Sequence, residues 1–360
     1  VESAQEILAK IWNWILVGEE HRPSRVTAEY AVASVWLLRL SIVAIVAGIV
    51  YFLIWSIERE LVGPAARVAI GFMAGVGLAV WGMQLLGKKY HVIAQGLLGG
   101  GLLVLYFSAF ASGPMYRLFD AHSMPVAFGL MILITVAAGV LSVRTNSLLI
   151  AILGLVGGYL TPVMLRTPTP NLPVFFSYIL LLGLGILAIA RFKPWRLLNY
   201  LGFLFTYALF FGAVFFPPTA VYQKADFAMA LTFLSAFFVL HSSLVYLHNL
   251  VRRTPSTNLE VIHLVANAGV YACFGYQLIS DACGRPYPAR MSLSLAVFYM
   301  AHVLGFFRRR LQDRPLLIAL IALSGAFTTW TLPLVLEKES LTIALSLLAF
   351  MFLWLGQRLN

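Results

Sequence analysis

Three histidines, His241, His263 and His302, stand inside long apolar segments of the sequence, together with Asn267. Imidazole binds transition metals and exchanges protons near neutral pH, and ionisable side chains inside membrane-spanning segments usually serve a function. Counting from the charged loops places the three rings at similar depths in consecutive segments. They could therefore hold a metal or haem, or relay protons. In the alternative interpretation, each ring bonds a nearby carbonyl or hydroxyl, such as that of Ser242, and its role is structural.

The rest of the sequence gives these histidines little support as metal ligands. There is no HExxH motif and no paired-cysteine spacing, and all 14 acidic residues map to loops, termini or segment ends. Proton-driven pumps usually bury a carboxylate, so proton coupling here would have to use a histidine. No phosphate-binding loop or nucleophile elbow occurs either. We expect no cofactor and no catalytic residues, and the three histidines are the one candidate ligand set for a metal.

A second group of candidate residues interrupts an apolar segment. The stretch LGLVGGYLTPVML, residues 153–165, contains Gly157, Gly158, Thr161 and Pro162. Glycine allows a neighbouring backbone to come close, and proline removes an amide donor from the helix. The segment could be a discontinuous helix that acts as a hinge or lines a substrate site with freed backbone groups. Alternatively, the glycines form a packing face and Pro162 ends the helix, which its position near the segment end favours.

This stretch has a counterpart later in the chain. Residues 148–161 align without gaps on residues 316–329, at an offset of 168. Two pairs in this alignment are Gly157 with Gly325 and Thr161 with Thr329. Six segments separate the copies, and an even number preserves orientation in the membrane. The offset therefore predicts a parallel repeat, whose halves are related by an axis along the membrane normal.

The elements that must position these residues are membrane helices. Of 360 residues, 61% are hydrophobic and 11% are charged, which leaves too little polar surface for a water-soluble protein. A spanning helix needs about 20 apolar residues. The fold class predicted is an all-α polytopic transmembrane bundle with about 12 spans. The expected spans are 34–54, 66–86, 92–112, 124–143, 147–165, 173–191, 197–216, 227–249, 259–280, 290–307, 315–333 and 340–357.

These spans imply three regions. Residues 1–30 form an N-terminal region, in which apolar positions at helical spacing over 1–17 predict an interfacial amphipathic helix, followed by a linker. Residues 31–193 form a first six-helix half, and residues 194–360 form a second. The joining segments are short and rich in proline, glycine or charge, so no separate soluble domain is expected.

The positive charge is distributed unequally between the two sides of the membrane. The segmentation places 17 of the 25 Lys and Arg residues on the side of the N-terminus. The positive-inside rule makes that side cytoplasmic, with both termini inside. The net charge of +11 therefore reflects how the chain is oriented in the membrane. We expect membrane lipids as partners, other membrane protein subunits as a further option, and no nucleic acid.

Between Trp36 and Phe211 the sequence contains four glycine-bearing blocks, in the order LVGPAARVAIGFMAGVGL (61–78), IAQGLLGGGLLVLYFSAF (93–110), NSLLIAILGLVGGYLTPVML (146–165) and FSYILLLGLGILAIARFKPWRLLNYLGF (176–203). In these blocks the chain resembles an uncharacterised bacterial family of predicted polytopic membrane proteins, known only as a domain of unknown function. The resemblance implies a location in the bacterial inner membrane. It implies no activity and no functional residues.

Three classes of function fit these observations. The favoured class is a membrane protein that binds or translocates a small molecule or a lipid-linked intermediate, because the glycine-broken segments occur twice. The second is a structural or assembly subunit of a membrane complex, which would dock through the N-terminal helix and the glycine faces. The third, and less favoured, is a membrane-embedded enzyme that uses the histidine cluster.

Overall fold

In the computed structural model of the chain, every described element of secondary structure is a helix. The described residues are 28–59, 62–86, 91–119, 122–165, 171–193, 195–216, 221–252, 257–284, 287–308, 313–336 and 338–359. The all-α prediction is therefore confirmed. The amphipathic helix expected over residues 1–17 lies outside the described residues.

Each expected span coincides with one helix in the described part of the chain. The helices are α2 (Ala28–Glu58), α3 (Pro64–Leu85), α4 (His91–Phe110), the π-helix η1 (Ala111–Met115), α5 (Ser123–Thr145), α6 (Leu148–Met164), α7 (Leu172–Phe192), α8 (Arg196–Val214), the 3-10 helix η3 (Lys224–Asp226), α9 (Phe227–Arg252), α10 (Asn258–Cys283), α11 (Pro288–Arg308), α12 (Arg314–Val335) and α13 (Lys338–Leu359). Ten of the spans among the described residues are long and apolar enough to cross a membrane. The other two, α6 and the apolar part of α13, are shorter.

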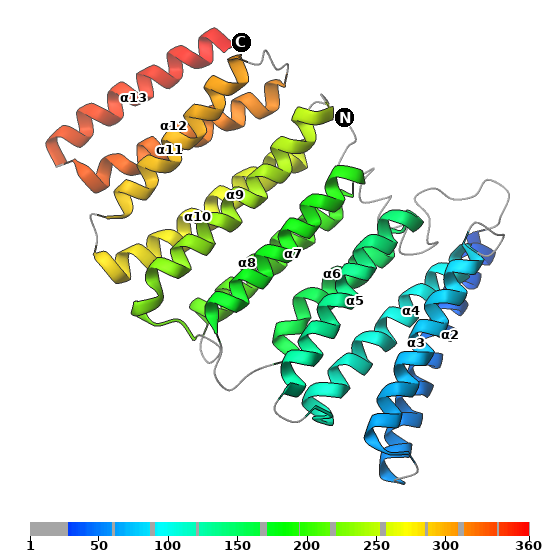
Figure 1. The fold of residues 1–360 in the computed structure, drawn as a ribbon. Coiled ribbons are helices and arrows are strands. Elements are labelled where there is room, and N and C mark those ends of the chain that lie inside the picture. The colour runs from blue at the N-terminus through cyan, green and yellow to red at the C-terminus, as the bar shows by residue number, and fades with distance from the viewer. Residues whose placement is uncertain are drawn as a thin grey trace. The chain divides into compact units, whose positions relative to one another are not determined.

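The chain divides into two compact units, Val1–Thr169 and Pro170–Asn360. Unit 1 contains α2 to α6, and unit 2 contains α7 to α13 (Figure 1). The predicted six-helix halves, residues 31–193 and 194–360, would place α7 with α2 to α6 in the first half. The repeat therefore stays a prediction.

Glycines bring the helices of unit 1 close together. Gly71, Gly75 and Gly82 of α3 all face α4, and a Cβ on any of them would meet atoms of that helix within 3.0 Å. From the other side, a Cβ on Gly101 of α4 would lie 2.8 Å from the backbone oxygen of Gly75. Small residues let the two backbones approach closely. Dispersion attraction between backbone atoms then takes the place of contacts between side chains.

A tyrosine joins α4, α5 and α6 in the same unit. The Tyr106 hydroxyl lies 2.8 Å from Oγ1 of Thr135 and donates to the Gly154 carbonyl at 3.2 Å. The Tyr106 ring covers Gly157, where a Cβ would collide with it. Gly157 is therefore required as a packing surface for an aromatic ring.

Unit 2 packs through aromatic rings instead. Phe210 of α8 lies 5.2 Å from Phe176 of α7, 6.2 Å from Phe237 of α9 and 5.9 Å from Phe274 of α10, measured between ring centroids. These spacings are typical of aromatic contact and bury large apolar areas. The four rings, called here the aromatic cluster, fill the space between α7, α8, α9 and α10, the green and yellow helices of Figure 1.

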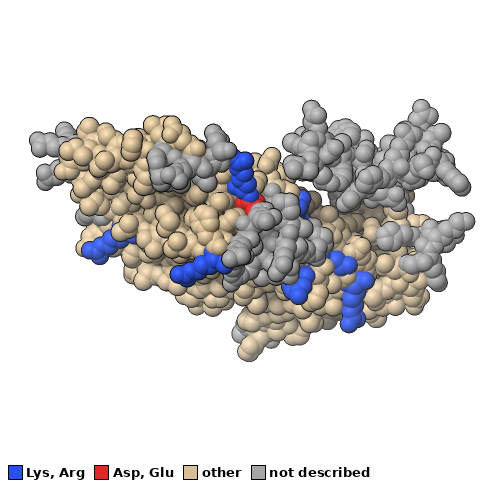
Figure 2. Space-filling view, turned by 90° about the horizontal axis from the view of Figure 1, so that it is seen from above, with Lys and Arg blue, Asp and Glu red and all other residues tan. Residues whose placement is uncertain are grey.

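Charged side chains are sparse on the surface that the structure describes. Seen from above, Lys and Arg form separate blue patches with tan surface between them (Figure 2). Many large apolar residues are exposed on the helices, for example Leu37 at 65% and Leu353 at 70%. Such a surface suits contact with lipid chains, in agreement with the ten candidate spans.

Candidate functional site

Two of the predicted histidines meet inside unit 2. His241 of α9 and His263 of α10 have ring centroids 5.9 Å apart. The Phe203 ring of α8 contacts both, at 5.4 Å from His241 and 4.7 Å from His263. His241 is 0% exposed and His263 is 5% exposed. Both rings face α8, which buries this imidazole pair in the interior of unit 2.

Three of the four ring nitrogens of the imidazole pair are buried without a hydrogen-bond partner among the described residues. Neither Nδ1 nor Nε2 of His241 has one, and Nε2 of His263 has none. Most buried side-chain nitrogens in proteins are hydrogen-bonded, because desolvating a polar group without a bond costs about 1–3 kcal/mol. Two neighbouring imidazoles that retain free bonding capacity are therefore a candidate binding site.

Asn267, the fourth residue of the predicted cluster, holds the surrounding helices in place. Its Oδ1 accepts a hydrogen bond from the Tyr207 hydroxyl of α8 at 2.7 Å. Its Nδ2 donates to the carbonyl of Phe238 at 2.9 Å and to Oγ of Ser242 at 3.0 Å, both on α9. Tyr207 also contacts the His241 ring, at 5.8 Å. Asn267 thus ties α8 and α9 to α10 directly beside the imidazole pair.

His302, the third predicted histidine, has a different environment. Its Nδ1 lies 2.8 Å from the carbonyl of Phe298, one turn earlier on α11. Its ring also packs on Phe298, with centroids 4.4 Å apart. Within the described residues, no three His, Cys, Asp or Glu side chains gather in a way that could hold a metal ion. The structure therefore joins two of the three histidines, and His302 has the local carbonyl bond that the structural interpretation expected.

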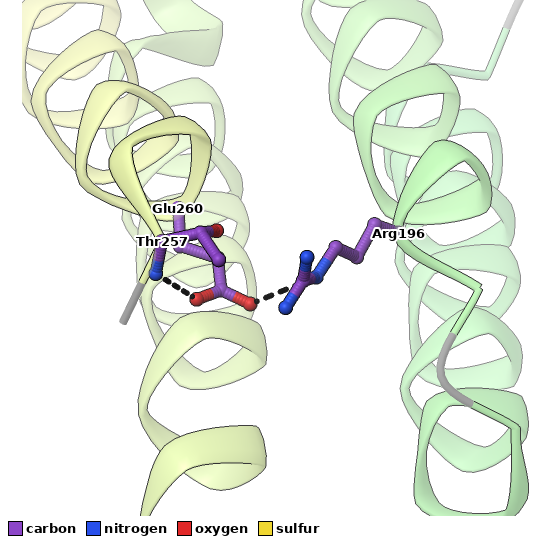
Figure 3. Close-up of polar contacts among 3 residues, drawn as sticks. All are labelled: Arg196, Thr257 and Glu260. Carbon is purple, nitrogen blue, oxygen red and sulfur yellow. Dashed lines mark hydrogen bonds and ion pairs between the residues drawn. The ribbon is translucent and has the colours of Figure 1, made fainter. Parts of the chain in front are cut away.

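An ion pair lies at the helix ends of unit 2 nearest the imidazole pair. Arg196, at the start of α8, places Nε 3.3 Å from Oε1 of Glu260 in the first turn of α10. Oε2 of Glu260 accepts a hydrogen bond from the Thr257 backbone amide at 2.9 Å, which caps α10 (Figure 3). Glu260 is buried although it is charged. The ion pair and the hydrogen bond together offset the free-energy cost of burying a charged carboxylate.

Tyr200 lies between this ion pair and the imidazole pair. Its ring is 5.5 Å from that of His263, and its buried hydroxyl has no hydrogen-bond partner among the described residues. Glu260, His263 and Asn267 follow at helical spacing on one face of α10, over a rise of about 10 Å. Together with Arg196 and Tyr200 of α8, they form a row of polar groups, called here the polar column, that leads from the helix ends to the imidazole pair.

Sequence reasoning did not identify Arg196, Tyr200 and Glu260 as functional candidates. Arg196 and Glu260 were assigned to loops and helix ends, where charge is ordinary. A signal was nevertheless present, because Arg196, Tyr200, Phe203 and Tyr207 recur at intervals of three and four residues along one face of α8. Alignment of that face with the histidines of α9 and α10 depends on tertiary packing.

The glycine and proline candidates lie in unbroken helices. Pro162 falls in the last turn of α6, and α12 continues to Val335. The Thr161 hydroxyl donates to the Gly157 carbonyl at 2.8 Å, and the equivalent Thr329 hydroxyl donates to the Gly325 carbonyl at 2.8 Å. The aligned pairs thus have the same local bonding. Both segments are continuous helices, as expected if the glycines serve for packing. A hinge or substrate-lining role for these residues and Gly158 stays a prediction.

A comparison with known families now extends the earlier resemblance. The model of a predicted membrane protein family, DUF2339, matches residues 33–360. The chain belongs to this family. The match covers α8, α9 and α10 as well as the first half, so the polar column lies within the family region. No curated protein and no solved structure was found to match the chain.

Proposed function

We propose that this membrane protein binds a small polar solute, or the polar part of a lipid-linked molecule, at the imidazole pair of unit 2 and moves it through the membrane. The observation that supports the proposal is the His241 side chain, which is 0% exposed and has two unpartnered ring nitrogens. A histidine with only a structural role would use those nitrogens, as His302 uses Nδ1 toward the Phe298 carbonyl.

The surroundings of the imidazole pair support the same proposal. The Asn267 side chain joins three helices by hydrogen bonds directly beside the imidazole pair. Polar residues inside membrane segments are costly and usually line substrate or ion pathways. The polar column gives the imidazole pair a route to one end of the helices, and the ion pair of Arg196 and Glu260 lies at its entrance.

The proposal includes a location and an orientation. The excess of Lys and Arg on one side supports an inner-membrane protein with both termini in the cytoplasm. In that orientation Arg196, the last residue of the segment RFKPWR (191–196), lies on the cytoplasmic side. The solute would then enter or leave the polar column from the cytoplasm, with membrane lipids around the apolar helices.

Solute efflux tests the proposal. Proteoliposomes are loaded with an aqueous extract of small bacterial metabolites, and mass spectrometry follows what leaves the vesicles. Wild type and His302→Phe are expected to release at least one polar compound faster than empty vesicles do. His241→Phe is expected to release it at the rate of empty vesicles, because phenylalanine keeps the ring packing and removes both nitrogens. Identical release by wild type and His241→Phe for every compound would contradict the proposal.

A further inference from the structure

We infer that the imidazole pair takes up one proton, delivered along the polar column from the end of unit 2 where Arg196 meets Glu260. This inference rests on the proposed function and specifies the ion that accompanies the solute. The observation behind it is the joint placement of the buried imidazole pair, the Tyr200 hydroxyl and the Glu260 carboxylate on adjoining faces of α8, α9 and α10.

The packing of the rings limits the size of what can bind in this conformation. The centroid of the Phe203 ring lies 4.7 Å from that of His263 and 5.4 Å from that of His241, and Tyr207 lies 5.8 Å from His241. These are distances between aromatic rings in contact. A solute needs the helices to separate, whereas a proton needs only one ring nitrogen with a free lone pair. Neutral imidazole carries a hydrogen on one nitrogen and a lone pair on the other, so each ring can accept one proton, and neither nitrogen of His241 is engaged with a partner.

The geometry also sets the number of protons. A proton on one ring makes an imidazolium, and a second on the adjacent ring, 5.9 Å away, would place two like charges together in an apolar interior. The imidazole pair therefore binds a single proton at a time. Two interacting imidazoles of this kind titrate as one unit rather than as independent groups.

Glu260 balances the charge of that proton. In the transfer, an O–H bond of a hydronium ion at the helix ends breaks, an N–H bond forms on a ring nitrogen, and water remains. The imidazolium forms one turn along α10 from the Glu260 carboxylate. The Arg196 side chain is 39% exposed and that of Glu260 only 10%, so solvent screens the repulsion from Arg196 more than the attraction to Glu260. The Tyr200 hydroxyl, which can donate and accept a hydrogen bond, lies along the route.

The other titratable side chains around the imidazole pair carry no charge near neutral pH. Among the described residues that surround it they are tyrosines of three helices, namely Tyr200 and Tyr207 on α8, Tyr271 on α10 and Tyr299 on α11. Tyr207 and Tyr271 are bonded to Asn267 and Ser235. The charged groups that face the imidazole pair are therefore Glu260 and Arg196.

Access is expected from one side only. The turns of α8, α9 and α10 that follow the imidazole pair, on the side away from Arg196, contribute Phe210, Phe237 and Phe274 to the aromatic cluster. These rings offer no hydrogen-bonding group, and the hydroxyls beside them are already engaged, that of Tyr207 with Asn267 and that of Tyr271 with Ser235. The polar column is therefore a half-path, open toward Arg196 and closed by the aromatic cluster.

Nitrogen-15 solid-state NMR of the histidine-labelled full chain in lipid vesicles tests the inference. The pH is lowered from about 8 to about 3, because a buried imidazole is harder to charge than an exposed one, which titrates between about pH 5 and 8. We expect one imidazolium per protein from the imidazole pair, absent in His263→Phe and His241→Phe and retained in His302→Phe. Glu260→Gln keeps the cap on α10 and removes the charge, so at the wild-type midpoint it should lower the charged fraction from one half to about one tenth.

Two results would overturn the inference. Both rings of the imidazole pair could stay neutral over the whole pH range, or both could become charged together. If a phenylalanine variant fails to fold, Glu260→Gln gives an independent readout, since an unchanged charged fraction in that variant would also contradict the charge balance. Efflux that needs His241 while both rings stay neutral would overturn the proton inference and leave the proposed function standing. If one ring becomes charged but no efflux occurs, the proposed function is overturned and the proton inference stands.

Discussion

Units 1 and 2 consist of similar apolar helices but are held together differently. In unit 1 the glycines of α3 and α4 let backbones touch, and hydroxyls such as that of Ser108 bond to their own helix. In unit 2 aromatic rings fill the interior, and Asn267 makes hydrogen bonds between helices. Unit 1 has a cavity of about 320 Å³ between α2 and α3, but apolar residues and glycines line it, such as Ile45, Phe52 and Gly71. Unit 2 instead combines bulky rings with imidazoles that retain bonding capacity. This difference is the reason why the proposed binding site lies in unit 2.

The largest stability effect is expected from breaking the polar frame of unit 2. Asn267→Leu removes three hydrogen bonds and leaves the Tyr207 hydroxyl and the Phe238 carbonyl buried without that partner. We expect a loss of about 2–3 kcal/mol in the free energy of unfolding, measured by titration with dodecyl sulfate in mixed micelles. Ser243→Ala is the control, because that hydroxyl bonds only locally, to the Val239 carbonyl. Equal unfolding midpoints for the two variants would contradict a structural role for Asn267.

A matched pair of glycines tests the packing of unit 1. A Cβ on Gly75 would lie 2.7 Å from Cγ of Leu105 and 3.1 Å from the Gly101 carbonyl oxygen, whereas one on Gly77 meets nothing within 4 Å. Gly75→Ala should therefore destabilise the protein by about 1–3 kcal/mol. Gly77→Ala should stabilise it by up to about 1 kcal/mol through helix propensity. The same micelle titration measures both, and a stabilising Gly75→Ala would refute close packing of α3 on α4.

The smallest effect is expected from the ion pair at the entrance to the polar column. The Arg196 side chain is 39% exposed, so solvent screens its attraction to Glu260. Arg196→Gln should cost at most about 1 kcal/mol, and the difference from wild type should shrink as salt is raised. Unfolding midpoints at low and high salt provide the measurement. A large loss that does not depend on salt would show that Arg196 acts through packing.

The sequence predicted the helices better than it predicted the site. Each described span matches an expected segment because length and apolarity decide whether a helix can cross a bilayer. Pro, Gly and charged residues in the short loops marked the helix ends, because they interrupt an apolar helix.

The histidines were predicted by residue type, but which of them meet depends on how far each helix is rotated about its axis. His241 and His263 face α8, and His302 bonds along its own helix. Tyr200 was missed because tyrosine is ordinary at the ends of membrane helices, where its ring lies at the interface. Only the tertiary arrangement places its hydroxyl between a carboxylate and an imidazole.

The central claim is that the imidazole pair becomes accessible to a solute although it is buried in the packed structure. Diethyl pyrocarbonate, which reacts with neutral imidazole, measures this directly when native membranes are labelled and peptides are quantified by mass spectrometry. We predict that His241, at 0% exposure, is labelled on opening of unit 2, and that Asn267→Leu, which loosens the frame, speeds the labelling. A His241 that reacts only after denaturation, in wild type and variant alike, would contradict a binding site there.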